Sequence, residues 1–420
     1  MSSTQATGRR HPDSAESKPS REDFGRMFMA RLHEAGMTEE VVFSRDEFSV
    51  RLKHSDEPAR DAWVVRLENT YREFFLAPPG LRDEVVARLV RVAMLPPDAT
   101  PPDFETAVPN LLPAVRCRSG YEIDLLRARI GGEAYTGAAQ EPLAVHLGVR
   151  VTYALPDAIM GLGPKEFAKW NVTAEQAMQA AMGRLAALSH PFVRANGCRG
   201  CFYSAANDDY DSSRMLLPQL CETVQVRGNH IAMVPATSHF LLAGDNDPKA
   251  LKIMVSEAEA AFGLPQGLSG YAFRLIDGEW RPWLPPKSHV LYPRFRALQL
   301  VTAYQAYRAQ HDLLVAQERS KPADETCFVA GYGLEAGKSN RPERSAVAWT
   351  QGVPTLLPQV DAIYFVQGNA DRGLRPVGRI AWDRVLDVMG DRMEPLGLYP
   401  ERYRVRCFPT DGELARLMSA

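Results

Sequence analysis

Helix-type and strand-type apolar patterns follow one another in an irregular order along this chain of 420 residues. Apolar spacings of three and four residues, typical of amphipathic helices, occur over Phe24–Met37, Thr173–Leu188 and Pro248–Phe262. Short apolar runs, typical of strands, lie between them. Because a doubly wound parallel sheet needs a regular strand–helix–strand repeat, this order predicts an α+β fold with mixed, mostly antiparallel sheets and packed helices.

Local signals place several boundaries. Thr173 and Gln176 have the spacing of a helix capping box. Asp277-Gly278 predicts a tight turn in a hairpin over Gly270–Trp283. The remaining strands are predicted over residues 41–52 as a hairpin, Trp63–Leu67, Leu143–Tyr153 with a break at Gly148, Phe202–Ser204, Ile231–Val234, His239–Ala243, Cys327–Ala330, Ala346–Thr350, Ala362–Gln367 and Arg402–Phe408. Leu81–Met94 and a last helix capped by Asp411 complete the helices.

Proline-rich stretches predict the domain organisation. Residues 1–20 are polar and are expected to form a disordered tail. An α+β region is expected over residues 21–285, with 21–96 and 114–285 as possible subdomains. Residues 286–322 predict a linker and a connecting helix, whose tyrosine-rich stripe indicates packing between modules. A smaller α+β module then occupies residues 323–420.

Composition excludes several classes of protein. The 49 Lys and Arg residues balance 51 Asp and Glu residues, so no basic excess indicates nucleic-acid binding. No apolar run approaches the roughly 20 residues of a membrane span. Six cysteines are too few for a disulfide scaffold in a chain of this length. These features predict a cytoplasmic protein without a nucleic-acid or membrane partner.

The segment Ala206–Leu216, which reads Ala-Asn-Asp-Asp-Tyr-Asp-Ser-Ser-Arg-Met-Leu, resembles the YtpQ-like family of uncharacterised bacterial proteins. Tyr153–Asp157 and Trp170–Leu185 are similar to the family's strand and its tryptophan-led helix. Met233–Pro235 and Leu241–Ala243 are similar to its later strand pair. The resemblance covers about residues 25–285 and implies a cytoplasmic bacterial protein with no established activity. It does not extend to residues 290–420.

The same segment holds the densest acidic run, and we treat its polar side chains as a candidate functional loop: Asn207, Asp208, Asp209, Tyr210, Asp211, Ser213 and Arg214. Alternating Asn207, Asp209 and Asp211 match the first ligands of a calcium-binding loop, but Ser212 and Pro218 replace the glycine and the glutamate that such a loop requires. A structural alternative is an Asx turn at Asn207 and Asp208, a helix cap at Asp211 and a clamp by Arg214.

Other motifs are incomplete. Cys198 and Cys201 form the single Cys-x-x-Cys pair, and a zinc site would need further ligands such as His190 and Cys221. The glycine-rich segment Gly331–Ser339 lacks phosphate-loop spacing and is interpreted as a polar loop.

The sequence is therefore compatible with two main functions. The first is a non-catalytic protein-interaction or regulatory module with a protein partner and no cofactor. The second is a metal-assisted hydrolase or transferase, in which Asp208, Asp209 and Asp211 hold a divalent cation. A zinc-stabilised module is a weaker third hypothesis.

Overall fold

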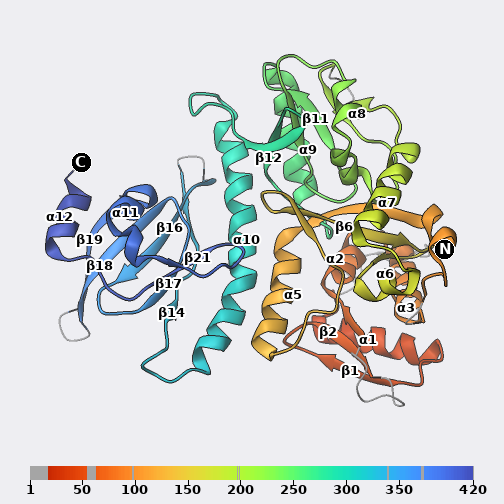
Figure 1. Cartoon of the computed structure of the whole chain (residues 1–420), viewed down its shortest axis with the longest axis horizontal. Helices are drawn as coiled ribbons and strands as arrows, with labels where there is room; N and C mark the ends of the chain where they lie inside the picture. Colours follow the sequence, from red (N-terminus) through yellow and green to blue (C-terminus); the bar gives the residue numbers. More distant parts are fainter. Residues whose placement is uncertain are drawn as a thin grey trace, which may run out of the picture. The chain divides into compact units, whose positions relative to one another are not determined.

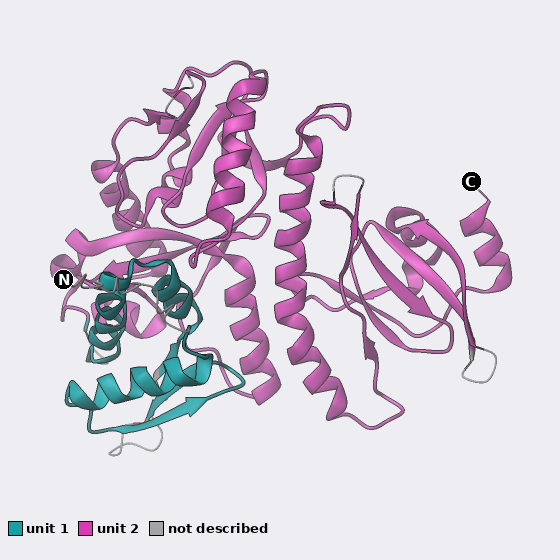
Figure 2. Ribbon diagram, turned by 180° about the vertical axis from the view of Figure 1, so that it is seen from behind, with its two compact units in different colours: residues 1–99 teal, residues 100–420 magenta. Residues whose placement is uncertain are grey.

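The computed structural model describes residues 18–53, 63–96, 99–195, 197, 199–337, 340–369 and 373–419. It separates into two compact units, residues 1–99 and residues 100–420 (Figure 2). Most of the tail expected over residues 1–20 lies outside the described residues. The segment 286–322, expected as linker and connecting helix, lies inside the second unit.

Unit 1 packs helices on a small antiparallel sheet of order β1-β2-β3. Its elements are α1 (Arg21–Glu34), β1 (Glu40–Ser44), β2 (Ser49–Lys53), β3 (Trp63–Arg66), α2 (Glu68–Leu76), η1 (Pro79–Leu81) and α3 (Arg82–Ala93). Helix α1 begins at a capping box in which Ser20 accepts a hydrogen bond from the backbone N–H of Asp23. It buries Phe24, Phe28 and Leu32 in the core of this unit.

The first sheet of unit 2 has the order β4-β6-β5, and β7 pairs with the end of β6. This part comprises α4 (Phe104–Ala107), η2 (Val108–Asn110), β4 (Leu111–Cys117), α5 (Arg118–Gly131), β5 (Glu141–Ala144), β6 (Leu147–Ala154), β7 (Ile159–Gly161), α6 (Pro164–Trp170) and α7 (Ala174–Leu188). The capping box of Thr173 and Gln176 is confirmed. The strand predicted over Leu143–Tyr153 is divided into β5 and β6, but the break lies at His146 (φ +63°) and the predicted break at Gly148 is wrong, since Gly148 lies within β6.

The second sheet of unit 2 is antiparallel throughout, with six strands in the order β13-β12-β10-β11-β9-β8. Its elements are β8 (Val193–Arg194), β9 (Cys201–Tyr203), η3 (Asp211–Leu216), α8 (Pro218–Glu222), β10 (His230–Met233), β11 (Leu241–Gly244), α9 (Pro248–Phe262), β12 (Ala272–Ile276) and β13 (Glu279–Trp283). Helix α9 covers one face through Met254, Val255 and Ala258. Phe240 and Phe273 fill the core on the other face.

The C-terminal part of unit 2 contains two four-stranded sheets, β14-β17-β21-β20 and β15-β16-β18-β19. Its elements are β14 (Phe328–Val329), β15 (Gly333–Ala336), β16 (Pro342–Thr350), β17 (Thr355–Pro358), β18 (Ala362–Asn369), β19 (Gly373–Ala381), α11 (Trp382–Met389), η4 (Gly390–Arg392), β20 (Glu394–Pro395), β21 (Arg402–Val405) and α12 (Asp411–Met418). Strand β15 corrects the polar loop predicted over Gly331–Ser339. The cap of α12 is Thr410, not the predicted Asp411.

The long helix α10 (Tyr292–Arg319) stands between the two parts of unit 2 and contacts α5 and α9 on one side and β14 and β16 on the other (Figure 1). Tyr307, which is buried, donates a hydrogen bond to the carbonyl of Glu401, and Arg296 pairs with Asp361 at 2.5 Å. The predicted packing role of the tyrosine stripe is therefore confirmed at Tyr307.

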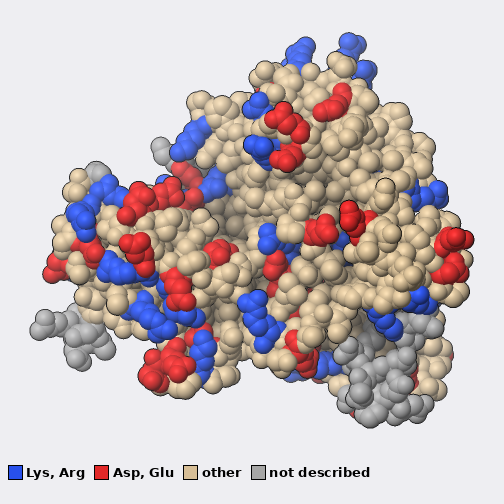
Figure 3. Space-filling view, viewed as in Figure 1, with Lys and Arg blue, Asp and Glu red and all other residues tan. Residues whose placement is uncertain are grey.

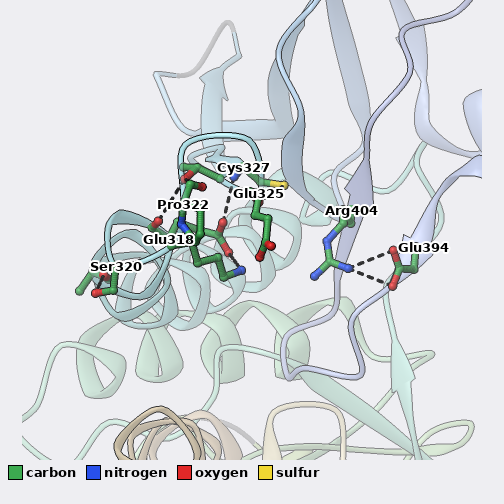
Figure 4. A network of polar contacts seen from close by, with 10 residues as sticks. Glu318, Ser320, Pro322, Glu325, Cys327, Glu394 and Arg404 are labelled. Carbon is green, nitrogen blue, oxygen red and sulfur yellow. Dashed lines mark hydrogen bonds and ion pairs between the residues drawn. The ribbon is translucent and has the colours of Figure 1, made fainter.

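A buried carboxylate joins the C-terminal end of α10 to the segment that follows it. Glu318 is 3% exposed and accepts hydrogen bonds from the backbone N–H of Cys327 and from Lys321 (Figure 4). In the same view, Arg404 pairs with Glu394 across the neighbouring strands β20 and β21.

The predicted α+β class with mostly antiparallel sheets is confirmed, since only β14–β17 and β16–β18 pair in parallel among the described strands. None of the described helices is both long enough and apolar enough to cross a membrane.

Candidate functional site

The Asn207–Arg214 loop follows β9 and leads into η3, where it packs against the sheet of β4 and β6. Ser213 accepts a hydrogen bond of 3.1 Å from the backbone N–H of Val115 in β4. The Tyr210 hydroxyl lies 3.1 Å from Thr152 Oγ1 in β6. Tyr210 is 3% exposed, so the loop is anchored in the core on both strands.

Asp208 and Arg214 form the strongest contact within the loop. Arg214 donates to both carboxylate oxygens of Asp208, at 2.6 and 2.7 Å, and Asp208 also accepts from the backbone N–H of Tyr210. Partial burial disfavours the charged carboxylate, but Arg214 outweighs it and lowers the pKa of Asp208 below its ordinary value. The Asx turn and the arginine clamp expected from the sequence are both present at Asp208.

Asp211 has a different role from the one predicted. Its carboxylate is fully buried and accepts hydrogen bonds from Ser204 and from the backbone N–H of Ala206, so it holds the preceding turn. No side-chain bond caps η3. The predicted helix cap at Asp211 is therefore wrong, because Oδ1 accepts from residues earlier in the chain and Oδ2 is buried without a hydrogen-bond partner.

Asn207 and Asp209 form the exposed tip of the loop. Both adopt left-handed backbone conformations, with φ of +52° and +61°. Asn and Asp tolerate this region better than most residues, although it still costs about 1 kcal/mol or more. The buried contacts of Asp208, Asp211 and Arg214 hold these conformations in place.

Beside the loop lie two arginines that the sequence analysis did not single out, Arg116 of β4 and Arg150 of β6, which we call the arginine pair. In the antiparallel ladder Arg116 pairs with Gly148 and Arg150 with Ala114. These four positions share one face of the sheet, and the two arginines occupy diagonal positions, which typically lie about 7–8 Å apart with their β-carbons somewhat closer.

Both guanidinium groups are partly buried, and neither forms an ion pair with a carboxylate in the part of the chain that the structure describes. Burial, reinforced by the neighbouring Arg150 charge, lowers the pKa of Arg116 to about 10. Burial also lowers the pKa of Arg150, whose Nε is buried without a hydrogen-bond partner. The pair is thus a local excess of positive charge, and partial burial disfavours the charged form of both side chains.

A glycine makes room for this arrangement. A β-carbon at Gly161 would lie 3.3 Å from Cζ of Arg150 and 2.7 Å from the β-carbon of Ala138. The Arg150 side chain therefore occupies space that a larger residue on β7 would fill.

One sequence signal could have marked each arginine by itself as unusual, although not their pairing. Each arginine interrupts an apolar strand sequence, Leu111–Cys117 and Leu147–Ala154, where a charge is costly unless it is paired or functional. The two lie far apart in sequence, and only the strand register brings them together.

The metal-ligating hypotheses gain no support from the geometry. Among the described residues, no group of three His, Cys, Asp or Glu side chains could hold a metal ion. Cys198 lies outside the described residues. Cys201 faces the core beneath α9, Cys221 faces the core on the other side of the six-stranded sheet, and His190 is exposed. The structure does not bring these three proposed ligands together.

A concave surface away from the loop, the α9 cavity, lies at the start of α9 and has a volume of about 670 Å³. Its lining includes the exposed cations Arg199, Arg227, Lys249 and Lys252. Elsewhere, on the face shown in Figure 3, Lys and Arg side chains are interspersed with Asp and Glu side chains.

Comparisons with protein-family models, with curated proteins and with solved structures gave no match.

Proposed function

We propose that this chain is a non-catalytic binding protein of the bacterial cytoplasm, acting by protein interaction or regulation, and that the Asn207–Arg214 loop meets its partner. One observation carries the proposal: some polar side chains of the loop bind one another or the chain beneath it, and others are left exposed at its tip. Asp208, Asp211 and Arg214 form the buried contacts, whereas Asn207 and Asp209 present their side chains to solvent.

Such a loop is preorganised for recognition. Its tip conformations are already held by buried contacts, so binding orders few additional groups, and this reduces the entropy lost on association. The resemblance of this segment to the YtpQ-like family adds support, because the shared residues include those that hold the loop.

No comparable observation favours the metal-assisted hydrolase or transferase. Both oxygens of Asp208 bind Arg214, and Asp211 is buried beneath the loop. A cation would have to displace Arg214 before it could bind Asp208.

The test replaces an exposed aspartate by lysine at two positions, Asp209 at the tip of the loop and, as a matched control, Asp277 in another turn. Asp277 is, like Asp209, an exposed aspartate with positive φ (+50°), in the β12–β13 hairpin. Proteins captured by the full chain would be identified and purified, and their affinity measured for Asp209→Lys and Asp277→Lys. We expect Asp209→Lys to weaken binding about tenfold or more, equivalent to about 1.4 kcal/mol, and Asp277→Lys to have little effect.

Equal effects of the two variants would contradict the role of the loop. Calorimetry with Mg²⁺, Mn²⁺ and Ca²⁺ provides the second arm. Stoichiometric binding that Asp209→Asn abolishes would favour the metal hypothesis over the proposed function.

A further inference from the structure

We infer that the arginine pair, Arg116 and Arg150, is a binding site for an oxyanion, either a phosphate or a carboxylate. The inference goes beyond the proposed function, since it concerns the sheet beside the Asn207–Arg214 loop and would hold even if the loop bound no protein. It rests on the placement of two like charges, on the groups around them and on the hydrogen-bonding capacity that they retain.

The placement is unfavourable without an anion. Two guanidinium groups on adjacent strands repel each other, and partial burial removes the water that would screen them. The carboxylates that act on them are Asp209, at the exposed tip of the loop, and Asp124, which already pairs with Arg127 at 3.0 Å. A bound oxyanion would neutralise the pair directly.

The donors that remain available suit this class of ligand. A guanidinium group has five N–H donors arranged for bidentate contact with carboxylate or phosphate. The Arg116 side chain donates from Nη1 to the carbonyl of Val115, and Arg150 Nε is buried without a hydrogen-bond partner among the described residues.

Tyr210 forms part of the surroundings but cannot donate to the anion. Thr152 Oγ1 donates to the carbonyl of Leu112, so it must accept the hydroxyl proton of Tyr210. The phenol therefore fixes the position of the loop beside the arginine pair, and recognition depends on the two guanidinium groups alone.

Asp209 gives a way to distinguish the anion site from a protein-binding loop. Its charge acts on Arg116 from the rim, so it competes with an incoming anion. Removal of this charge should strengthen oxyanion binding, the opposite of its expected effect on a protein partner at the loop.

The experiment is isothermal titration calorimetry of the full chain with inorganic phosphate at constant ionic strength. A second titration uses a short peptide of glutamates, with the matching glutamine peptide as its control. Binding of phosphate alone identifies a free or ester phosphate as the ligand source, and binding of the glutamate peptide alone identifies a carboxylate. If neither binds at millimolar concentration, the inference is overturned.

The variants locate the site. Arg116→Met and Arg150→Met should each weaken binding about tenfold or more, since each removes charge-assisted hydrogen bonds. Arg116→Lys and Arg150→Lys retain the charge and should recover part of the affinity, which separates loss of the ligand contact from loss of the fold. Asp209→Asn should tighten binding.

Two controls exclude other cationic surfaces. Arg129→Met removes an exposed arginine of α5 and should leave the affinity unchanged. The double variant Lys249→Met/Lys252→Met tests the α9 cavity. If that variant abolishes phosphate binding while the arginine-pair variants do not, the arginine pair is not the site.

Discussion

Arg214, 1% exposed, donates two hydrogen bonds to the carboxylate of Asp208, six residues earlier in the chain. Arg214 belongs to the same loop, so it neutralises one of the carboxylates in the densest acidic run of the sequence. It also leaves the neighbouring Asp209 as the exposed charge at the tip of the loop. The acidic segment is therefore a supported turn rather than a set of converging carboxylates.

Loss of this clamp should destabilise unit 2. Arg214→Met leaves Asp208 without its partner, and breaking a buried ion pair costs about 3–5 kcal/mol. Because Asp208 retains access to solvent, we expect a cost near 3 kcal/mol. Urea-induced unfolding of the full chain, followed through the unfolding midpoint, measures the change.

Arg281→Met is the matched control, because it breaks an ion pair with Glu279 in which both side chains are exposed. Exposed pairs contribute about 0–1 kcal/mol, so the unfolding midpoint should scarcely move. Similar small shifts for both variants would mean that the Asp208–Arg214 pair does not hold the loop.

Gly161 provides a test of the arginine pair that leaves both arginines in place. A β-carbon at this position would contact Ala138 and Cζ of Arg150, so Gly161→Ala should displace the guanidinium group and weaken phosphate binding. Gly183→Ala, in α7 where an added β-carbon meets no neighbouring atom within 4 Å, should preserve binding and stabilise the helix by about 0.5–1 kcal/mol. Unchanged phosphate affinity in Gly161→Ala would count against the placement of Arg150.

Tyr210→Phe separates support of the loop from recognition of the anion. Loss of the hydrogen bond to Thr152 should lower the free energy of unfolding by about 0.5–1.5 kcal/mol. Phosphate affinity should stay within about twofold, because the Tyr210 proton is already donated to Thr152. A large loss of affinity with little change in stability would show that the phenol itself binds the ligand.

His146 predicts a pH dependence of stability. It is 5% exposed, its Nδ1 lies 2.7 Å from the hydroxyl oxygen of Tyr399, and burial lowers the pKa of His146 from 6.5 to about 4. Between these two pH values, His146 is more often protonated in the unfolded chain than in the folded chain. Stability therefore falls by up to roughly 3 kcal/mol as the pH drops from 6.5 to 4.

Thermal unfolding between pH 4 and pH 7 checks this dependence. His146→Asn keeps a residue that tolerates the positive φ at this position and should flatten the profile. His190→Asn removes an exposed imidazole from the same unit and should leave the profile unchanged. Parallel profiles for the wild type and His146→Asn would contradict the role of His146.

Local patterns predicted the elements whose signals lie within a few residues of each other. Helix α9 matches its predicted bounds, because Asp247 caps it and Pro248 occupies its first turn. The hairpin at Asp277-Gly278 likewise follows from its turn residues. Such elements depend on short-range geometry that the residue types alone specify.

Several features that depend on tertiary contacts were not predicted. Helix α5 was not recognised, and the turn at His146 is held by Tyr399, 253 residues away. At the candidate site, the clamp of Asp208 by Arg214 is local and was anticipated. The arginine pair arises only from the register of β4 and β6, which no signal within either strand specifies.

The most direct measurement is an NMR titration of the full, ¹⁵N-labelled chain with inorganic phosphate at constant ionic strength, observing the arginine Nε–Hε resonances. The Arg116→Lys and Arg150→Lys variants assign the two signals. An oxyanion site at the arginine pair predicts saturable shifts of both resonances with one common Kd, while the Arg129 resonance stays in place. Contradiction would come from Arg116 and Arg150 resonances that remain unmoved at millimolar phosphate.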